Sequence, residues 1–282
     1  MMNNNQKLEE KNYSVNNLYN KNRKYIIGII KSINTALYNS SQTFFLCLYY
    51  MDLIFNNSNF DKLFKLFYED KEDDLKIEIN KSDIIMISLS CLIVATKYNE
   101  NDPNVPNIIS FINLCSYYSF NKFNYKVNDI TKAEVIVLKF LEYKLNYFTL
   151  YHYFSFFFTH GFLFENIFEK EIIKEQKYKK DELLEKIYIL SREIMNKFVE
   201  DNNNINYILG NKIYFTSIQI LIWSTEHILN ISFIELFKEE KNIFTLLYKI
   251  DLEGNKDNNE EIKNIIKKIN DDIHKKGKNN RN

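Results

Sequence analysis

The scarcity of glycine and proline is the sequence feature that most limits the fold. The chain has 282 residues but only five glycines and two prolines, and the glycines lie far apart. Sandwiches and barrels of β-strands need frequent turns rich in these two residues, so the scarcity favours long helices. It also excludes the glycine-rich loops that hold phosphate groups in nucleotide-binding enzymes.

Charge and cysteine content narrow the function further. The 37 Lys and Arg residues balance the 37 Asp and Glu residues, which argues against nucleic-acid binding. The three cysteines are odd in number and widely spaced within apolar runs, as expected of free thiols in a reducing compartment. The first residues, MMNNNQKLEEKN, have no apolar core and do not resemble a signal peptide. We therefore expect a protein of the nucleus or cytoplasm.

The sequence contains no recognisable catalytic or metal-binding motif. The four histidines form no HxH or HxxxH pattern, and no nucleophile, base or phosphate-binding arrangement stands out. The stretch 147–164 has no Lys, Arg, Asp or Glu, but it is aromatic and too polar for a membrane span. The sequence predicts a non-enzyme with no cofactor, no small-molecule substrate and no membrane association.

Apolar periodicity predicts helices along most of the chain. In the first half they cover residues 23–38, 42–55, 84–98, 105–115 and 128–145. In the second half they cover residues 151–164, 181–200, 209–229 and 232–249. The polar segments predict a disordered extension (1–22), a solvated acidic insertion (56–81) and a charged, solvated tail (251–282).

Two of these helices are similar to each other. The segment IIMISLSCLIVATKY, from Ile84, aligns without gaps on IYFTSIQILIWSTEH, from Ile213. Isoleucine, serine, leucine and threonine recur at matching positions, with small residues between large ones. The match favours a repeated helical unit, one in each of two lobes. We expect an all-α fold with lobes at 23–149 and 150–250.

Arg23 and Asp52 are charged residues in unfavourable positions. Arg23 lies in the first turn of its predicted helix, where the helix dipole disfavours a cation, and Asp52 lies in the last turn of an apolar helix, where it disfavours an anion. The two would compensate each other if their helices packed antiparallel. Two unrelated surface charges explain them equally well from helix physics alone.

Lys97 and Glu134 form a second group of interest. Glu134 lies about 40° from the apolar direction of its helix, and a carboxylate at the edge of an apolar stripe needs a hydrogen-bond donor. Lys97 ends the predicted apolar helix at 84–98, where a cation suits the dipole. The two side chains could pair within the chain, or they could present a cation and an anion side by side to a partner.

These residues carry a family resemblance. The run ATKYNENDPNVPNIISFINL, followed by NDITKAEVIVLKFLEYKLNYFT, resembles the cyclin box, with Lys97 and Glu134 on the family's Lys and Glu. TFFLCLYYMDLIF resembles the family's earlier helix, with Asp52 as its Asp. Arg23 precedes Asp52 by 29 residues, which is the spacing of the family's buried Arg–Asp pair and favours pairing.

The resemblance covers residues 23–149, with 150–250 as a degenerate second lobe, and it has departures. The 56–81 insertion is longer than in the family, and so is the stretch between Lys97 and Glu134. Leu53 replaces an arginine. The first helix lacks the tryptophan that cell-cycle cyclins use to bind substrate motifs, which argues against substrate recruitment at that place.

The resemblance implies a cyclin-like fold of two lobes with about five helices each. It further implies a non-catalytic subunit that forms a heterodimer with a cyclin-dependent kinase and activates it. Lys97 and Glu134 would bond the backbone around the kinase αC helix, and neighbouring apolar side chains would complete the contact: Tyr98, Leu138, Tyr143 and Leu145. The alternative is a cyclin-fold adaptor or scaffold, transcriptional or meiotic, that does not activate a kinase.

Overall fold

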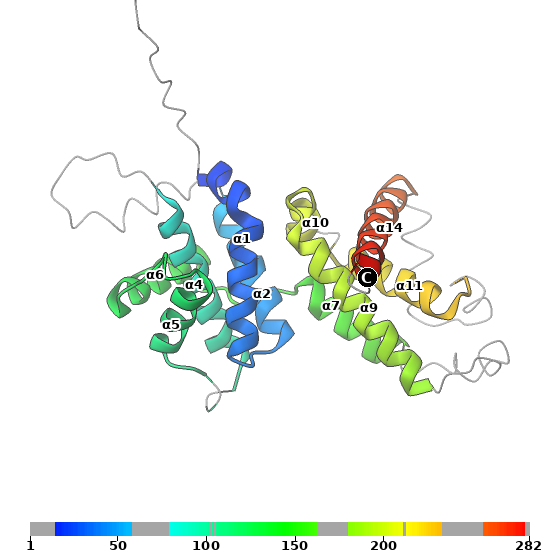
Figure 1. The fold of residues 1–282 in the computed structure, drawn as a ribbon, viewed down its shortest axis with the longest axis horizontal. Helices are drawn as coiled ribbons and strands as arrows, with labels where there is room; N and C mark the ends of the chain where they lie inside the picture. Colours follow the sequence, from blue (N-terminus) through cyan, green and yellow to red (C-terminus); the bar gives the residue numbers. More distant parts are fainter. Residues whose placement is uncertain are drawn as a thin grey trace, which may run out of the picture. The chain divides into compact units, whose positions relative to one another are not determined.

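The computed structural model describes residues 15–57, 79–101, 103, 105–162, 180–210, 213–232 and 256–279. All regular structure in these ranges is helical, which confirms the all-α prediction (Figure 1). The helix predicted at 232–249 and most of the 56–81 insertion lie outside the described residues. The chain divides into two compact units, residues 1–39 with 50–145 and residues 40–49 with 146–282.

The first unit is built around a helix that is buried on nearly all sides. This helix, α4 (Lys81–Asn99), contacts its three neighbours, which are α1 (Val15–Ala36), α5 (Ile108–Tyr118) and α6 (Val127–Phe140) (Figure 1). Asn80 caps its N-terminus by accepting hydrogen bonds from two backbone N–H groups. Residues 50–55 of α2 (Ser41–Phe55) also belong to this unit. No described helix is long and apolar enough to cross a membrane.

The prediction of a disordered extension over residues 1–22 is wrong for residues 15–22. Helix α1 begins at Val15, and Tyr19 is fully buried. Its ring stacks on Phe55 with centroids 4.4 Å apart, and its hydroxyl donates to a buried carboxylate, that of Asp52. These contacts give the polar segment a reason to be ordered that periodicity did not reveal. Residues 1–14 lie outside the described residues.

Helix α6 ends earlier than the predicted Leu145. It stops at Phe140, and Glu142 and Tyr143 follow with φ of 50° and 58°, in the left-handed region. The Tyr143 N–H donates to the Leu138 carbonyl at 2.9 Å, so the turn closes as a Schellman motif without glycine. Each such residue costs roughly 1–2 kcal/mol relative to a right-handed conformation.

The second unit is also centred on a buried helix. This is α11 (Ile213–Leu229), which contacts α7 (Leu150–Phe156), α9 (Lys180–Glu200) and α14 (Lys256–Asn279). Helix α7 continues as the π-helix η2 (Phe157–Phe162). The predicted 209–229 helix is interrupted, because α10 (Ile205–Leu209) ends before Gly210 and α11 starts at Ile213.

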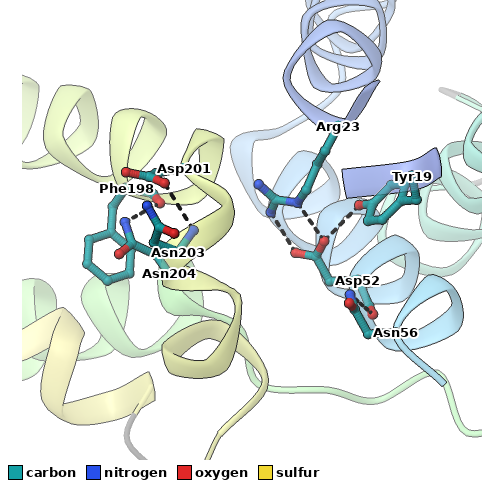
Figure 2. Close-up of polar contacts among 8 residues, drawn as sticks. All are labelled: Tyr19, Arg23, Asp52, Asn56, Phe198, Asp201, Asn203 and Asn204. Atoms are coloured by element: carbon teal, nitrogen blue, oxygen red, sulfur yellow. Dashed lines mark hydrogen bonds and ion pairs between the residues drawn. The ribbon is translucent and has the colours of Figure 1, made fainter. Parts of the chain in front are cut away.

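A short 3-10 turn, η4 (Asn202–Asn204), closes the end of α9 (Figure 2). Asp201 accepts a hydrogen bond from the Asn203 N–H at 3.0 Å. The buried Asn204 amide donates to the Phe198 carbonyl at 2.9 Å, which satisfies one of the carbonyls that a helix end leaves open.

The two central helices share more than their sequence pattern. Ser88 donates to the Ile84 carbonyl in α4, and Ser217 donates to the Ile213 carbonyl in α11. Thr96 and Thr225 repeat this bond to the carbonyl four residues earlier, at 2.8 and 2.7 Å. These small polar side chains thus bond a carbonyl of their own helix, and the Ser217 hydroxyl also lies 2.9 Å from the Leu150 carbonyl of α7. This supports the predicted repeat of one helical unit.

The prediction of a solvated tail over residues 251–282 is wrong for α14. Ile262 and Ile266 are fully buried, and Ile269 and Ile273 are partly buried. These positions follow the i, i+4, i+7, i+11 spacing of one helix face, and that face packs against α9 and α11. The signal was present in the sequence but was hidden among the many charged and Asn residues around it.

Candidate partner-binding site

Arg23 and Asp52 form a fully buried ion pair (Figure 2). Arg23 Nε donates to Asp52 Oδ1 at 2.8 Å, and Nη2 donates to Oδ2 at 2.7 Å, so the contact is bidentate. The Tyr19 hydroxyl donates to the same Oδ1 at 2.7 Å. One carboxylate at the end of α2 therefore holds two successive turns of α1.

The electrostatics of this cluster keep Arg23 charged and Tyr19 neutral. Burial, followed by the charge of Asp52, raises the pKa of Tyr19 well above its usual value. Burial on its own would lower the pKa of Arg23, but the hydrogen bond and charge of Asp52 outweigh it and raise the pKa. Since all three side chains are buried, the cluster is structural and is not available to a partner.

Lys97 and Glu134 also form an ion pair, but at the surface. Lys97 Nζ lies 2.7 Å from Glu134 Oε1. The Lys97 side chain is 48% exposed, whereas that of Glu134 is only 9% exposed. Lys97 lies in the last turn of α4 and Glu134 lies on α6, and the packing of these two helices brings them together. The pair is therefore preformed in the free chain.

The predicted apolar contact residues lie at the ends of the same two helices. Tyr98 and Tyr143 are exposed, and Leu138 and Leu145 are half-buried. Tyr98 follows Lys97, and Leu138 lies one turn beyond Glu134. The Leu145 carbonyl accepts a hydrogen bond from the Tyr50 hydroxyl at 2.7 Å, which fixes the chain beyond the α6 turn.

Sequence reasoning missed two further apolar residues of this surface. Val127 and Val135 on α6 are both exposed. At 100° per residue they lie about 20° and 100° from Glu134, on the same side as Leu138. Their signal was weak because an exposed valine on a helix is common and needs no explanation.

Other groups offer no competing chemistry in the described part of the chain. No cluster of three or more His, Cys, Asp or Glu residues there could hold a metal ion. Cys47, Cys91 and Cys115 are buried free thiols. Burial raises the pKa of Cys115 to about 12 and that of Cys91 further, so neither thiol is a reactive nucleophile.

Comparison with known families identifies the class. The family described as the cyclin N-terminal domain matches residues 1–146, which is more than half of the chain. The protein therefore belongs to the cyclin family, whose members are regulatory proteins that act through protein partners. A search among curated proteins gave no significant match.

Proposed function

We propose that this chain is the regulatory subunit of a cyclin-dependent Ser/Thr protein kinase, acting in the nucleus or cytoplasm. The observation that carries the proposal is the preformed Lys97–Glu134 pair beside exposed apolar side chains. The cyclin resemblance assigns this pair to the backbone around the kinase αC helix. Tyr98, Leu138, Tyr143 and Leu145 would supply the surrounding apolar contact.

The geometry of the pair suits this role. An ammonium group has three N–H donors, so Lys97 can donate to a kinase carbonyl while it still holds Glu134. The carboxylate has a second oxygen, Oε2, that can accept from a backbone N–H. Glu134 is held by the packing of α4 on α6, and a site that needs no reorganisation loses less free energy on binding.

Activation would follow from a shift of conformational population. A kinase is active when its αC glutamate pairs with its catalytic lysine and its activation loop is ordered. A partner that binds the active conformation more tightly than the inactive one shifts the kinase population toward the active conformation. Moving a kinase from about 1% to about 99% active requires roughly 5.5 kcal/mol of such preference. Losing one buried, hydrogen-bonded interfacial charge typically costs about 2–5 kcal/mol, a comparable amount.

The test is co-purification and kinase assay with a cyclin-dependent kinase. Glu134→Ala and the double variant Lys97→Ala with Glu134→Ala should weaken binding by roughly 30-fold to several-thousand-fold and remove activation. The matched control is the Lys197–Glu200 pair of α9, which has a similar distance of 2.8 Å. Alanine at both of those positions should leave kinase binding unchanged.

Two results would contradict the proposal. If the variants that lack the Lys97–Glu134 pair still bound and activated the kinase normally, this surface would not be the kinase contact. If the unmodified chain bound a kinase without raising its activity, the adaptor or scaffold alternative would replace the activator.

A further inference from the structure

Helix α5 has an apolar outer face that packing does not explain. Its inner face is buried through Phe111, Ile112 and Cys115. On the outer side, Ile109 is 55% exposed, Tyr117 71% and Phe120 84%. We call these three residues the α5 stripe: Ile109 and Tyr117 lie about 80° apart around the helix axis and roughly 12 Å apart along it, and Phe120 follows in the turn that ends α5.

The backbone at Phe120 is strained. Phe120 and Asn121 have φ of 56° and 59°, in the left-handed region. The Asn121 N–H donates to the Ser116 carbonyl at 2.8 Å, so α5 ends in the same type of turn as α6. Glycine would adopt this positive φ at lower cost than phenylalanine. Because the Phe120 ring is exposed, burial of the ring does not offset the cost. Strain of this kind that is kept in a folded protein is typical of binding positions.

The charges that follow the α5 stripe in the sequence, up to the start of α6, are positive. Between residues 103 and 128 the sequence has no Asp or Glu, and its only charged residues are Lys122 and Lys126. Both lysines are exposed and follow the turn that carries Phe120. An apolar stripe that ends in two cations is complementary to apolar side chains accompanied by carboxylates.

We propose that the α5 stripe, with Lys122 and Lys126, binds an acidic amphipathic helix of a partner protein. Apolar anchors of that helix would cover Ile109, Tyr117 and Phe120, and its carboxylates would meet the two lysines. A membrane surface fits less well, because two lysines and an 11-residue helix supply little electrostatic or apolar anchoring. The stripe uses residues of α5 and its turn, so the proposal does not depend on kinase binding through Lys97 and Glu134.

The test uses the full chain and two labelled synthetic helical peptides in a fluorescence anisotropy titration. Both carry leucine at positions i, i+4, i+7 and i+11, and the remaining surface is glutamate-rich in one and lysine-rich in the other. We expect the glutamate peptide to bind at least about tenfold more tightly than the lysine peptide. Added salt should weaken its binding.

Phe120→Gly should weaken binding of the glutamate peptide roughly tenfold or more while the melting temperature stays equal or rises. Glu142→Gly is the matched control, because Glu142 occupies the equivalent strained position in the α6 turn. Lys122→Glu should weaken binding as well, whereas Lys132→Glu on α6 should not. Tyr117→Ser tests the stripe independently if Phe120→Gly alters folding.

The proposal would be overturned if the two peptides bound equally, or if the glutamate peptide bound Phe120→Gly and Tyr117→Ser as tightly as the unmodified chain. It would also be overturned if the glutamate peptide did not bind while phosphatidylserine–phosphatidylcholine vesicles bound in a manner that required Phe120. That result would make the stripe a membrane contact.

Discussion

Glu134 is buried beneath Lys97, and the 2.7 Å ion pair between them is unequal, since Lys97 reaches solvent and Glu134 scarcely does. The Glu134 carboxylate depends on Lys97 for a hydrogen-bond donor, whereas water can solvate the Lys97 ammonium group. This inequality predicts different consequences for the removal of each partner.

Lys97→Ala should therefore destabilise the chain more than Glu134→Ala. The first leaves a buried carboxylate without this donor, at a cost of about 1–3 kcal/mol, and the second leaves a cation that water can solvate. The double variant should recover part of the loss. Urea unfolding monitored by circular dichroism measures all three. Equal effects of the two single variants would show that Glu134 finds another donor or solvent.

The buried cluster predicts a larger effect at Asp52. Asp52→Ala strands the Arg23 charge in the interior and should cost about 3–5 kcal/mol, a large share of the roughly 5–15 kcal/mol of a typical domain. Tyr19→Phe removes one hydrogen bond to a charged acceptor but keeps the ion pair and the ring, so it should cost less, about 1.5–3 kcal/mol. The free energy of unfolding in denaturant distinguishes the two. A near-neutral Asp52→Ala would be incompatible with a buried pair.

Acidification should weaken the start of α7 through His152. The Thr149 N–H lies 3.2 Å from His152 Nδ1 and the Thr149 hydroxyl 2.7 Å, so the neutral ring accepts at the helix cap. Burial lowers the pKa of His152 in the folded chain below its usual value near 6.5.

The direction of this pH dependence follows from proton uptake by the folded and the unfolded chain. Between the unfolded and the lowered folded pKa, the unfolded chain binds more protons, so this contribution is complete above about pH 6.5 and is lost as the pH falls through the folded value. Thermal unfolding from pH 8 to pH 5 measures it against His152→Gln, which does not titrate. If both chains lost stability equally, His152 would not be the responsible group.

Helix α14 should contribute substantially to the stability of the chain. Ile266→Ala removes a fully buried side chain and should cost about 2–5 kcal/mol. Lys267→Ala, at the next and exposed position, is the control and should change little. Chemical denaturation measures the free energy of unfolding of both variants. If the two variants were equally stable, the tail would be solvated, as the sequence first suggested.

The sequence alone determined the features that rest on local patterns. The scarcity of glycine and the apolar periodicity were enough for an all-α fold, and the gap-free alignment of the segments from Ile84 and Ile213 was enough to predict that α11 repeats α4. The ordered spacing of Arg23, Asp52, Lys97 and Glu134 was enough for the family. Such patterns lie within a few turns of one helix or at fixed separations in the sequence. They can therefore be recognised without knowing which helix faces pack together.

Only the tertiary structure decided the features that need a partner from elsewhere in the chain. Apolar periodicity did not predict that Tyr19 is buried, because its hydroxyl bonds a carboxylate that lies 33 residues away in the sequence. Helix physics left the pairing of Arg23 with Asp52 undecided, and it left Lys97 and Glu134 either paired or facing outward. The packing of α4 on α6 joins Lys97 and Glu134 in an ion pair at the surface, with the Glu134 side chain largely buried and the Lys97 side chain exposed. Burial depends on surfaces that meet only when the chain has folded, and a linear pattern does not contain that information.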